Sequence, residues 1–354
     1  MVGWRFWIDR GGTFTDVVAQ SPSGKLITHK LLSENPDFYN DAPLQGIRDV
    51  LEINKDEPIP VKTIDAVKIG TTIATNALLE RKGERTALVI NSGFADALKI
   101  GYQNRPDIFA RKIILPEMLY EEVVEINGRV AADGSEILPL DTKGLMHDLI
   151  RIKSKGINSL AIVFMFSFRY PEHELIAKRI ASEVGFTQIS VSHELSPLIK
   201  LVSRGDTTVV DAYLSPLLRR YIDNLSSELI GVELQFMQSS GGLVEAKAFC
   251  GKDAILSGPS GGVVGAAKTS SLSGFDKIIG FDMGGTSTDV SRFDGQYERQ
   301  YDSEVAGIRI RSPMMNIHTV AAGGGSILHF DGARYRVGPE SAGAEPGPAC
   351  YRRG

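Results

Sequence analysis

A nine-residue motif occurs twice in this chain and constrains its fold more than any other feature of the sequence. Residues 9–17 read DRGGTFTDV and residues 282–290 read DMGGTSTDV, so seven of the nine positions are identical. Each copy follows a short apolar run that is typical of a β-strand, and each contains a glycine pair that is typical of a tight turn. The duplication therefore predicts two related lobes that each begin with the same β-hairpin.

The sequence between the two copies alternates between strand-like and helical patterns. Continuous apolar runs indicate strands at 66–70 and 159–166, whereas residues 204–229 predict a long helix that is interrupted near Pro216. Apolar residues recur at helical spacing in three further segments, 42–53, 145–155 and 172–184. This alternation predicts an α/β fold, and 354 residues are enough for two or three domains.

The residue types of the repeated motif suit phosphate binding. A glycine pair lets backbone N–H groups approach an anion closely, because no Cβ obstructs them, and threonine hydroxyls add further donors. Two such loops that face one another would grip a triphosphate from both sides, which suits in-line phosphoryl transfer. Neither copy is a Walker A or GxGxxG sequence. The candidate phosphate ligands are Gly11, Gly12, Thr13, Thr15, Gly284, Gly285, Thr286 and Thr288.

Five charged residues accompany these loops as candidate catalytic groups. We expect Asp9 and Asp282 to organise Mg²⁺ through its water shell, since Mg²⁺ usually keeps several waters and takes one or two carboxylates. Asp16 and Asp289 are expected either to orient the loops or to position an attacking water, and Arg10 to stabilise transferred charge or to contact the substrate. A purely structural pair of hairpin turns is the alternative, although turns do not require the same Thr-x-Thr-Asp after the glycines.

Two further segments rich in small and hydroxyl residues each lead into a predicted helix. In residues 70–76 the candidate substrate contacts are Thr71, Thr72 and Asn76, because N–H groups at a helix start can bind a carboxylate; helix capping is the alternative. In residues 257–262 the candidates are Ser257 and Gly258, with close helix packing as the alternative. Residues 323–326 (GGGS) are expected to approach the site closely.

These motifs resemble those of the actin-like ATPase superfamily, whose two ribonuclease-H-like lobes each carry such a phosphate loop. More narrowly, nearly the whole chain resembles the hydantoinase A/oxoprolinase family. Arg10 favours the ATP-dependent 5-oxoprolinases within it, since related subunits more often carry an aliphatic residue there. The matching segments are IDRGGTFTDV from Ile8, GTTIATNALLERKGERTALV from Gly70, LSGPSGGVVGA from Leu256, GFDMGGTSTDVS from Gly280, AAGGGS from Ala321 and VGPESAGAEPGPACYRRG from Val337.

The resemblance implies an actin-like architecture with a first lobe, an inserted α/β domain and the start of a second lobe. It divides the chain into an N-terminal hydantoinase/oxoprolinase domain at residues 1–200 and the start of the ATPase domain at residues 201–354. Full-length family members continue to a glycine-rich adenosine loop and to a part that resembles hydantoinase B. We therefore expect a missing C-terminal part or a hydantoinase B-like partner, and a homo-oligomer when the enzyme is complete.

The reaction implied by the resemblance is ATP-dependent hydrolysis of a cyclic amide. 5-Oxo-L-proline, ATP and water would give L-glutamate, ADP and phosphate through phosphorylation of the lactam oxygen, with ATP and Mg²⁺ as the cofactors and a place in glutathione metabolism. A hydantoinase A or ATP-dependent ketone carboxylase subunit is one alternative. An inactive nucleotide-binding remnant is the other.

Composition restricts the partners and the compartment. The net charge is −4, and no basic stripe indicates a nucleic-acid partner. No apolar run approaches the roughly 20 residues of a membrane span, and no signal-peptide pattern opens the chain, so a cytoplasmic protein is expected. Cys250 and Cys350 fit a reducing compartment, and the absence of HxxxH and CxxC argues against a zinc site.

Overall fold

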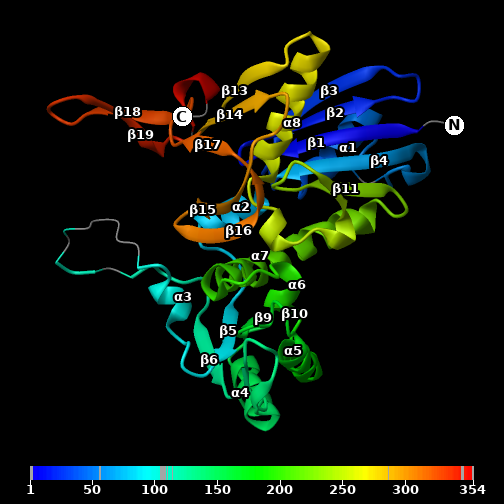
Figure 1. Cartoon of the computed structure of the whole chain (residues 1–354). Helices are drawn as coiled ribbons and strands as arrows, with labels where there is room; N and C mark the ends of the chain where they lie inside the picture. Colours follow the sequence, from blue (N-terminus) through cyan, green and yellow to red (C-terminus); the bar gives the residue numbers. More distant parts are fainter. Residues whose placement is uncertain are drawn as a thin grey trace.

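The computed structural model describes residues 3–55, 57–103, 109, 111–113, 115–285, 287–343 and 347–352. Helices and strands alternate along most of the chain, and the described strands form two larger sheets and several small ones. Figure 1 shows one sheet and the second hairpin unit in the upper half of the molecule, with a separate α/β domain below them. The predicted α/β class is confirmed.

The first sheet begins with the predicted meander. Strands β1, β2 and β3 are antiparallel neighbours, and β4 pairs with the other side of β1 in parallel. Strand β11 then adds in parallel to β4, although most of the chain lies between them. The sheet order is β12-β11-β4-β1-β2-β3, with bounds β1 (Trp4–Arg10), β2 (Phe14–Gln20), β3 (Leu26–Leu32), β4 (Ile64–Thr71), β11 (Glu233–Met237) and β12 (Leu243–Glu245).

The second sheet is inserted between β4 and β11 and is parallel throughout. Its order is β10-β9-β5-β6, and alternate residues of its strands pack on opposite faces, as in Val89 against Leu88. Helices α4 and α5 cover one face and α7 covers the other. The elements are β5 (Thr86–Asn91), β6 (Glu122–Ile126), β9 (Ser159–Val163), β10 (Gln188–Val191), α4 (Thr142–Ser154), α5 (Glu172–Val184) and α7 (Leu201–Glu228).

Helix α7 runs through Pro216, so the predicted interruption is wrong. Proline at 216 has no N–H for the carbonyl of Ala212, four residues earlier. The Ser159 hydroxyl on β9 donates to that carbonyl at 2.6 Å, and the backbone N–H of Glu84 donates to the next carbonyl, of Tyr213, at 2.9 Å. The Ser159 hydroxyl therefore replaces the donor that proline removes from the Ala212 carbonyl, and Glu84 adds a second bond at the same turn.

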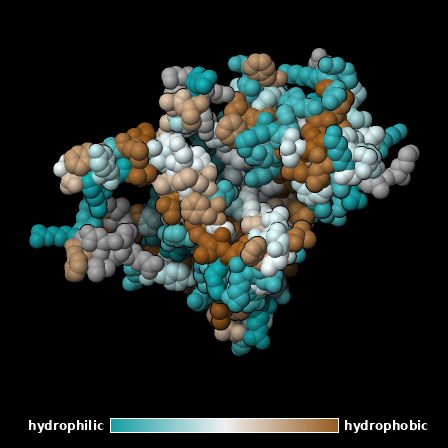
Figure 2. All heavy atoms as spheres, turned by 90° about the horizontal axis from the view of Figure 1, so that it is seen from above, coloured by the Kyte–Doolittle hydropathy of each residue, from teal (hydrophilic) through white to brown (hydrophobic). Residues whose placement is uncertain are grey.

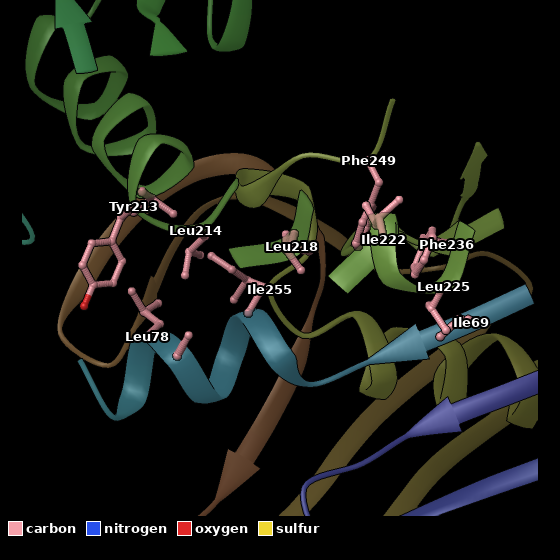
Figure 3. Close-up of a cluster of buried hydrophobic side chains, with 14 of the residues drawn as sticks. Ile69, Leu78, Tyr213, Leu214, Leu218, Ile222, Leu225, Phe236, Phe249 and Ile255 are labelled. Carbon is pink, nitrogen blue, oxygen red and sulfur yellow. The ribbon is translucent and has the colours of Figure 1, made fainter. Parts of the chain in front are cut away.

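The C-terminal half of α7 packs into the core of the first lobe. Figure 3 shows its apolar side chains facing β4, α2 and β11 in one cluster. Because its N-terminal half packs on the second sheet, α7 joins the two parts of the structure through a single rigid element. The labelled members of the cluster are Ile69, Leu78, Tyr213, Leu214, Leu218, Ile222, Leu225, Phe236, Phe249 and Ile255.

The second copy of the motif forms a second three-stranded meander. Strands β13, β14 and β17 are antiparallel in the order β13-β14-β17, like β1-β2-β3. Residues 257–262, predicted to lead into a helix, are already helical and form the first turns of α8. The elements are α8 (Ser257–Leu272), β13 (Lys277–Met283), β14 (Thr288–Asp294), β15 (Arg299–Val305), β16 (Ile308–Met315) and β17 (Ile317–Val320).

Short elements complete the described part of the chain. None of its helices is both long enough and apolar enough to span a membrane. The predicted division between residues 200 and 201 falls just before α7 and stays a prediction. Strand β11, which follows this division in the sequence, pairs with β4 of the first sheet. The remaining helices and strands are α1 (Ala42–Leu51), α2 (Ile73–Leu79), α3 (Ala97–Ile100), α6 (Ser192–Leu195), β7 (Arg129–Val130), β8 (Glu136–Leu138), β18 (Ser326–Phe330) and β19 (Tyr335–Ser341).

The two meanders differ in how well they are covered. Phe6 and Ile8 on β1 are 0% and 3% exposed, whereas Ile279 and Phe281, at the matching positions of β13, are 75% and 68% exposed. Apolar groups are visible among the hydrophilic ones on the face seen in Figure 2. Buried apolar area stabilises a fold by about 25 cal/mol per Å², so the open face of β13 is an unused source of binding free energy.

Candidate nucleotide site

The two repeated loops have the same backbone geometry. In the first hairpin Asp9 is the cross-strand partner of Asp16, and in the second Asp282 is the partner of Asp289. The Gly11 N–H donates to the Phe14 carbonyl at 3.0 Å, and the Gly284 N–H donates to the Ser287 carbonyl at 2.9 Å. The sequence repeat is therefore also a structural repeat, down to the hydrogen bond that closes each turn.

Each turn presents backbone N–H groups without protein partners. Among the described residues, the N–H groups of Gly12 and Gly285 donate no hydrogen bond. A Cβ placed on Gly12 would lie 3.5 Å from the Asn76 side-chain nitrogen, which brings a second donor beside the first loop. Unpaired donors in a glycine turn suit an anion. Thr286 lies outside the described residues, and its predicted phosphate contact stays a prediction.

Thr15 and Thr288, at matching positions of the two copies, point into the protein. Thr15 is fully buried, with its hydroxyl 3.0 Å from that of Ser33, and the Ser33 hydroxyl donates to the Gly11 carbonyl at 2.6 Å. The Thr288 hydroxyl donates to the Ala322 carbonyl at 2.6 Å. These bonds hold the turns in shape. A phosphate contact by Thr15 or Thr288 stays a prediction, as does one by Thr13.

The glycine-rich segment at 323–325 braces the second loop. Its Gly324 and Gly325 N–H groups donate to the carbonyls of Gly284 and Gly285 at 2.9 and 2.7 Å. A Cβ on Gly323 would lie 2.7 Å from the Gly284 carbonyl oxygen, closer than side chains are found to pack. The segment therefore lies directly behind the second phosphate loop, close to the candidate site as its sequence predicts.

The start of α8 lies against both leading carboxylates. A Cβ on Gly258 would lie 3.1 Å from Asp9 Oδ1, and one on Gly262, a turn later, would lie 3.9 Å from Asp282 Oδ2. Burial is the main cause that raises the pKa of Asp9 to about 6; the negative charges of Asp16 and Asp282 add to it, and Lys30 opposes it. Two carboxylates that repel one another in this way attract a cation.

The second carboxylate of each hairpin has a different neighbour. Lys30 Nζ donates to both oxygens of Asp16 at 2.7 Å, whereas the Thr319 hydroxyl donates to Asp289 Oδ1 at 2.6 Å. Burial raises the pKa of Asp289, and the charge of Asp282 adds to the shift. The second carboxylate of the first hairpin is therefore paired with a cation, whereas that of the second hairpin is bonded to a neutral hydroxyl. A hollow of about 200 Å³ lies beside Asp282 and Asp289 and is lined also by Pro259, Gly262, Phe281 and Ile317.

Arg10 lies on the other face of β1 from Asp9. Its guanidinium lies 5.7 Å from the centre of the Tyr221 ring on α7, and it lowers the pKa of Asp41, which burial raises overall. Its backbone carbonyl accepts a hydrogen bond from the Thr72 N–H at 3.1 Å. This position is that of a residue that fixes β1 against α7 and α2. A role of Arg10 in stabilising transferred charge, or in contacting the substrate, stays a prediction.

The candidate substrate residues lie where α2 and α8 begin. The buried Ser257 hydroxyl donates to the Met237 carbonyl at 2.6 Å and accepts from the Thr71 N–H at 3.3 Å, so it joins β11, β4 and α8. The Asn76 side-chain nitrogen donates to the Thr72 hydroxyl at 3.4 Å. Of this set, Thr72 and Asn76 are the better placed to reach a ligand at the first loop. The substrate contacts of all five candidates stay predictions: Thr71, Thr72, Asn76, Ser257 and Gly258.

The described residues contain no group of three or more His, Cys, Asp or Glu side chains that could hold a metal ion directly. The pair Asp9 and Asp282 would leave most positions of a Mg²⁺ ion to water and to phosphate oxygens. That is the usual environment of Mg²⁺ in phosphoryl-transfer sites. The two carboxylates therefore fit the predicted metal role, which stays a prediction.

Comparison with protein-family models covers nearly the whole chain. Residues 5–185 match the model described as the hydantoinase/oxoprolinase N-terminal region. Residues 204–354 match the model described as hydantoinase/oxoprolinase.

Similar proteins include enzymes that are much longer than this chain. 5-Oxoprolinase 1 of Arabidopsis thaliana is 47% identical over 99% of the chain, which spans 30% of that protein. The crystal structure of the ATP-dependent caprolactamase of Pseudomonas jessenii superposes with a TM-score of 0.82 at 33% identity, over 99% of this chain and 52% of that one. A nucleotide-free acetone carboxylase structure, at 23% identity and a TM-score of 0.78 over 96% of this chain and 51% of its own, shares the fold. The predicted actin-like architecture is confirmed.

Proposed function

Because the chain belongs to the hydantoinase/oxoprolinase family, we propose that it is the nucleotide-binding part of an ATP-dependent cyclic amide hydrolase. The proposed substrate is 5-oxo-L-proline, and the products are L-glutamate, ADP and phosphate. The similarity to curated 5-oxoprolinases of plant, amoeba and yeast, at 44–47% identity, supports this substrate. Relatives that act on other substrates are less similar, such as the caprolactamase α subunit at 33%.

The observation that carries the proposal is that Asp9 on β1 and Asp282 on β13 lie against one stretch of α8. A phosphate chain between the two hairpins would meet the Gly12 and Gly285 N–H groups and both carboxylates. Asp9 and Asp282 would hold Mg²⁺ through water, with the second hairpin as the stronger attractor because it lacks a counterpart of Lys30. When bound, Mg²⁺ supplies positive charge that offsets the charge on the transferring phosphoryl group.

An amide carbonyl is a poor electrophile, and ATP provides the means of activating it. In the proposed reaction the lactam oxygen attacks the γ-phosphorus, and the bond from that phosphorus to the bridging oxygen of ADP breaks. Water then adds to the activated carbon, and the carbon–nitrogen bond opens with protonation of the nitrogen, which leaves an acyl phosphate. A second water adds to the carbonyl carbon of this acyl phosphate, and phosphate leaves with the former lactam oxygen, so two waters are consumed for each glutamate formed. The residues of this chain would position the phosphates and neutralise their charge, which is most of what such a reaction requires.

In this proposal the complete reaction requires protein beyond the residues of this chain. The chain spans about 30% of the length of the curated 5-oxoprolinases it matches. The exposed Ile279 and Phe281 on β13 offer an apolar face to a C-terminal part or to a hydantoinase B-like partner. We propose that such a part completes both the adenosine site and the lactam site, in a homo-oligomeric cytoplasmic enzyme.

The test is an ADP-release assay on the chain together with its completing part, with 5-oxo-L-proline, hydantoin, caprolactam, or acetone with bicarbonate. Of these compounds, we expect only 5-oxo-L-proline to stimulate ADP release, with one glutamate formed for each ADP. Stimulation only by acetone with bicarbonate would instead indicate a ketone carboxylase. MgATP binding without any turnover would indicate a nucleotide-binding remnant. Calorimetry should show weak MgATP binding to the chain alone and tighter binding once it is completed.

A further inference from the structure

The structural repeat isolates a segment that exists only in the second copy. In the first copy β2 and β3 are joined by the short turn at residues 21–25, whereas β14 and β17 are joined by residues 295–316, which form the hairpin of β15 and β16. Figure 1 shows this hairpin extending from β14 and β17 to α7, at the level where the inserted domain begins. We refer to residues 295–316 as the arm.

The arm buries one side of β16 against the rest of the molecule. Ile308, Ile310, Met314 and Met315 are all at most 9% exposed, whereas most of β15 faces solvent. The Thr207 hydroxyl on α7 accepts a hydrogen bond from the Arg311 N–H at 2.8 Å. This alternation of buried and exposed residues shows that β16 is docked on the rest of the molecule, and the bond to Thr207 places its first half on α7.

An ion pair fixes the end of the arm. Arg309 Nε donates to Asp206 Oδ2 on α7 at 2.7 Å, and Arg309 Nη2 donates to the Leu98 carbonyl of the inserted domain at 2.9 Å. The Arg309 guanidinium also lies 5.6 Å from the ring centre of Tyr102. Asp206 is 5% exposed. Removal of Arg309 would leave a buried carboxylate without its counter-ion, which is far more costly than loss of a surface pair.

The base of the arm is tied to the first lobe. The Met315 N–H donates to the Ser239 carbonyl at 2.7 Å, and the Ser312 hydroxyl donates to Asp253 Oδ1 at 2.7 Å. Both partners lie in the segment between β11 and α8. The arm therefore spans from the inserted domain to the first lobe, and both of its attachments precede β17.

One short continuous segment, residues 309–325, connects the ion pair to the glycines that contact the second phosphate loop. Met315 is followed by β17, where Thr319 holds Asp289, and then by Gly324 and Gly325, which hold the carbonyls of the phosphate loop. A shift of the arm would be passed along β17 to these contacts, because strands and tight turns transmit displacement rather than absorb it. In the first copy Ser33, which follows β3, likewise bonds the loop at the Gly11 carbonyl, but only the short turn at residues 21–25 precedes β3.

We propose that Arg309 and Asp206 are positioning residues, which set the second phosphate loop relative to the first through the docked arm. The inference rests on the proposed function, because it gives the arm a role in phosphoryl transfer. Neither residue touches the nucleotide. Their contribution is the orientation of Asp282, Asp289 and the loop glycines, to which phosphoryl transfer is sensitive at the scale of about 1 Å.

The experiment compares Arg309→Gln and Asp206→Asn with the double variant, in which an uncharged pair can keep a hydrogen bond. Gln300→Ala, on the exposed side of β15, is the control within the arm. Hydrogen–deuterium exchange is measured on the nucleotide-free chain. We expect each single variant to raise exchange several-fold in residues 277–294 and to leave residues 4–20 unchanged. The double variant should recover in part, and the control should match the parent.

Turnover of the completed enzyme gives the second readout. Each single variant should lower kcat for lactam-dependent ADP release about tenfold, with KM for the lactam within about twofold. Unchanged exchange in the second hairpin, or an equal rise in both hairpins, would overturn the proposal, and so would an unchanged kcat. If the parent enzyme turned over no lactam, the proposed function would fail, while the exchange result would still decide whether the arm positions the loop.

Discussion

Asp9 and Asp282 lie against the same stretch of α8, at Gly258 and Gly262, which are one helical turn apart. A Cβ at position 258 would lie 3.1 Å from Asp9 Oδ1, whereas one at position 262 would lie 3.9 Å from Asp282 Oδ2, an ordinary contact distance. Two carboxylates from strands far apart in the sequence thus share one helix face. A side chain at 258 would therefore make Asp9 give way by a few tenths of an ångström, whereas one at 262 would leave Asp282 in place.

Substitution of Gly258 should therefore disturb the site, although alanine favours a helix more than glycine does. We expect Gly258→Ala to displace Asp9 and to weaken MgATP binding or turnover of the completed enzyme about tenfold, which corresponds to about 1.4 kcal/mol. Gly265→Ala, in the same helix with open space around the new Cβ, should leave binding unchanged and stabilise the fold by up to about 1 kcal/mol. Equal effects of the two substitutions on MgATP affinity would contradict the role given to Gly258.

Removal of Asp282 tests the metal role directly. Asp282→Ala in the completed enzyme should lower turnover by at least about 100-fold, because charge stabilisation at a phosphoryl group is worth several kcal/mol. Asp148→Ala on α4, in the inserted domain, serves as the matched control and should retain activity. Near-normal turnover of the Asp282 variant across a magnesium titration would remove this residue from metal binding.

The raised pKa of Asp9 predicts a pH dependence of stability. An acid whose pKa is about 6 in the folded chain and 3.8 ordinarily holds its proton more tightly when folded. Its contribution to stability is therefore fully present below about pH 4 and is lost as pH rises toward 6. The Tm of Asp9→Asn should therefore rise relative to that of the parent as the pH is raised from 4.5 to 7.5. Circular dichroism melts without nucleotide measure this difference.

A carboxyl with the opposite shift provides the control for that trend. Lys277 and Arg292 hold the pKa of Asp294 below its ordinary value, so its stabilising contribution is present at neutral pH and is lost as pH falls. Asp294→Asn should lose Tm relative to the parent at pH 7.5, and less so in acid. The same sign of pH dependence in both variants would show that Asp9 is not held in its protonated form by the fold.

The repeated motif predicted the hairpins, and the alternation of strand and helix patterns predicted the α/β class, because both signals are local. Turn glycines and strand alternation depend on near neighbours, so Asp9 and Asp282 could be placed at strand ends from sequence alone. The hydroxyls of Thr15 and Thr288 could not be placed in this way, since their partners Ser33 and Ala322 lie elsewhere in the chain. A serine beyond the third strand, near the turn it braces, is at most a weak signal in one sequence.

Long-range contacts account for what sequence reasoning missed. The residues of the arm alternate as any exposed hairpin does, and nothing local indicates that Arg309 meets Asp206, which lies more than a hundred positions earlier. The sequence predicts that residues 257–262 lead into a helix, whereas they are already helical, although glycine and proline disfavour a helix. Packing against Asp9 and Thr72 overrides that preference. At Gly258 the close packing that the absence of a Cβ allows outweighs the low helix propensity of glycine.

Pro216 offers a prediction about the same conflict between local rule and distant partner. Ser159→Ala should lower the free energy of unfolding by about 1–3 kcal/mol, because the Ala212 carbonyl would be left buried without a donor. Ser227→Ala, an exposed serine that bonds within its own helix, should change it by less than about 0.5 kcal/mol. Pro216→Ala restores an N–H to the helix at the position where Ala212 needs one. Combined with Ser159→Ala, it should recover much of the loss, as measured by a urea-denaturation double-mutant cycle. Additive losses in that cycle would show that Ser159 does not serve the carbonyl that Pro216 leaves open.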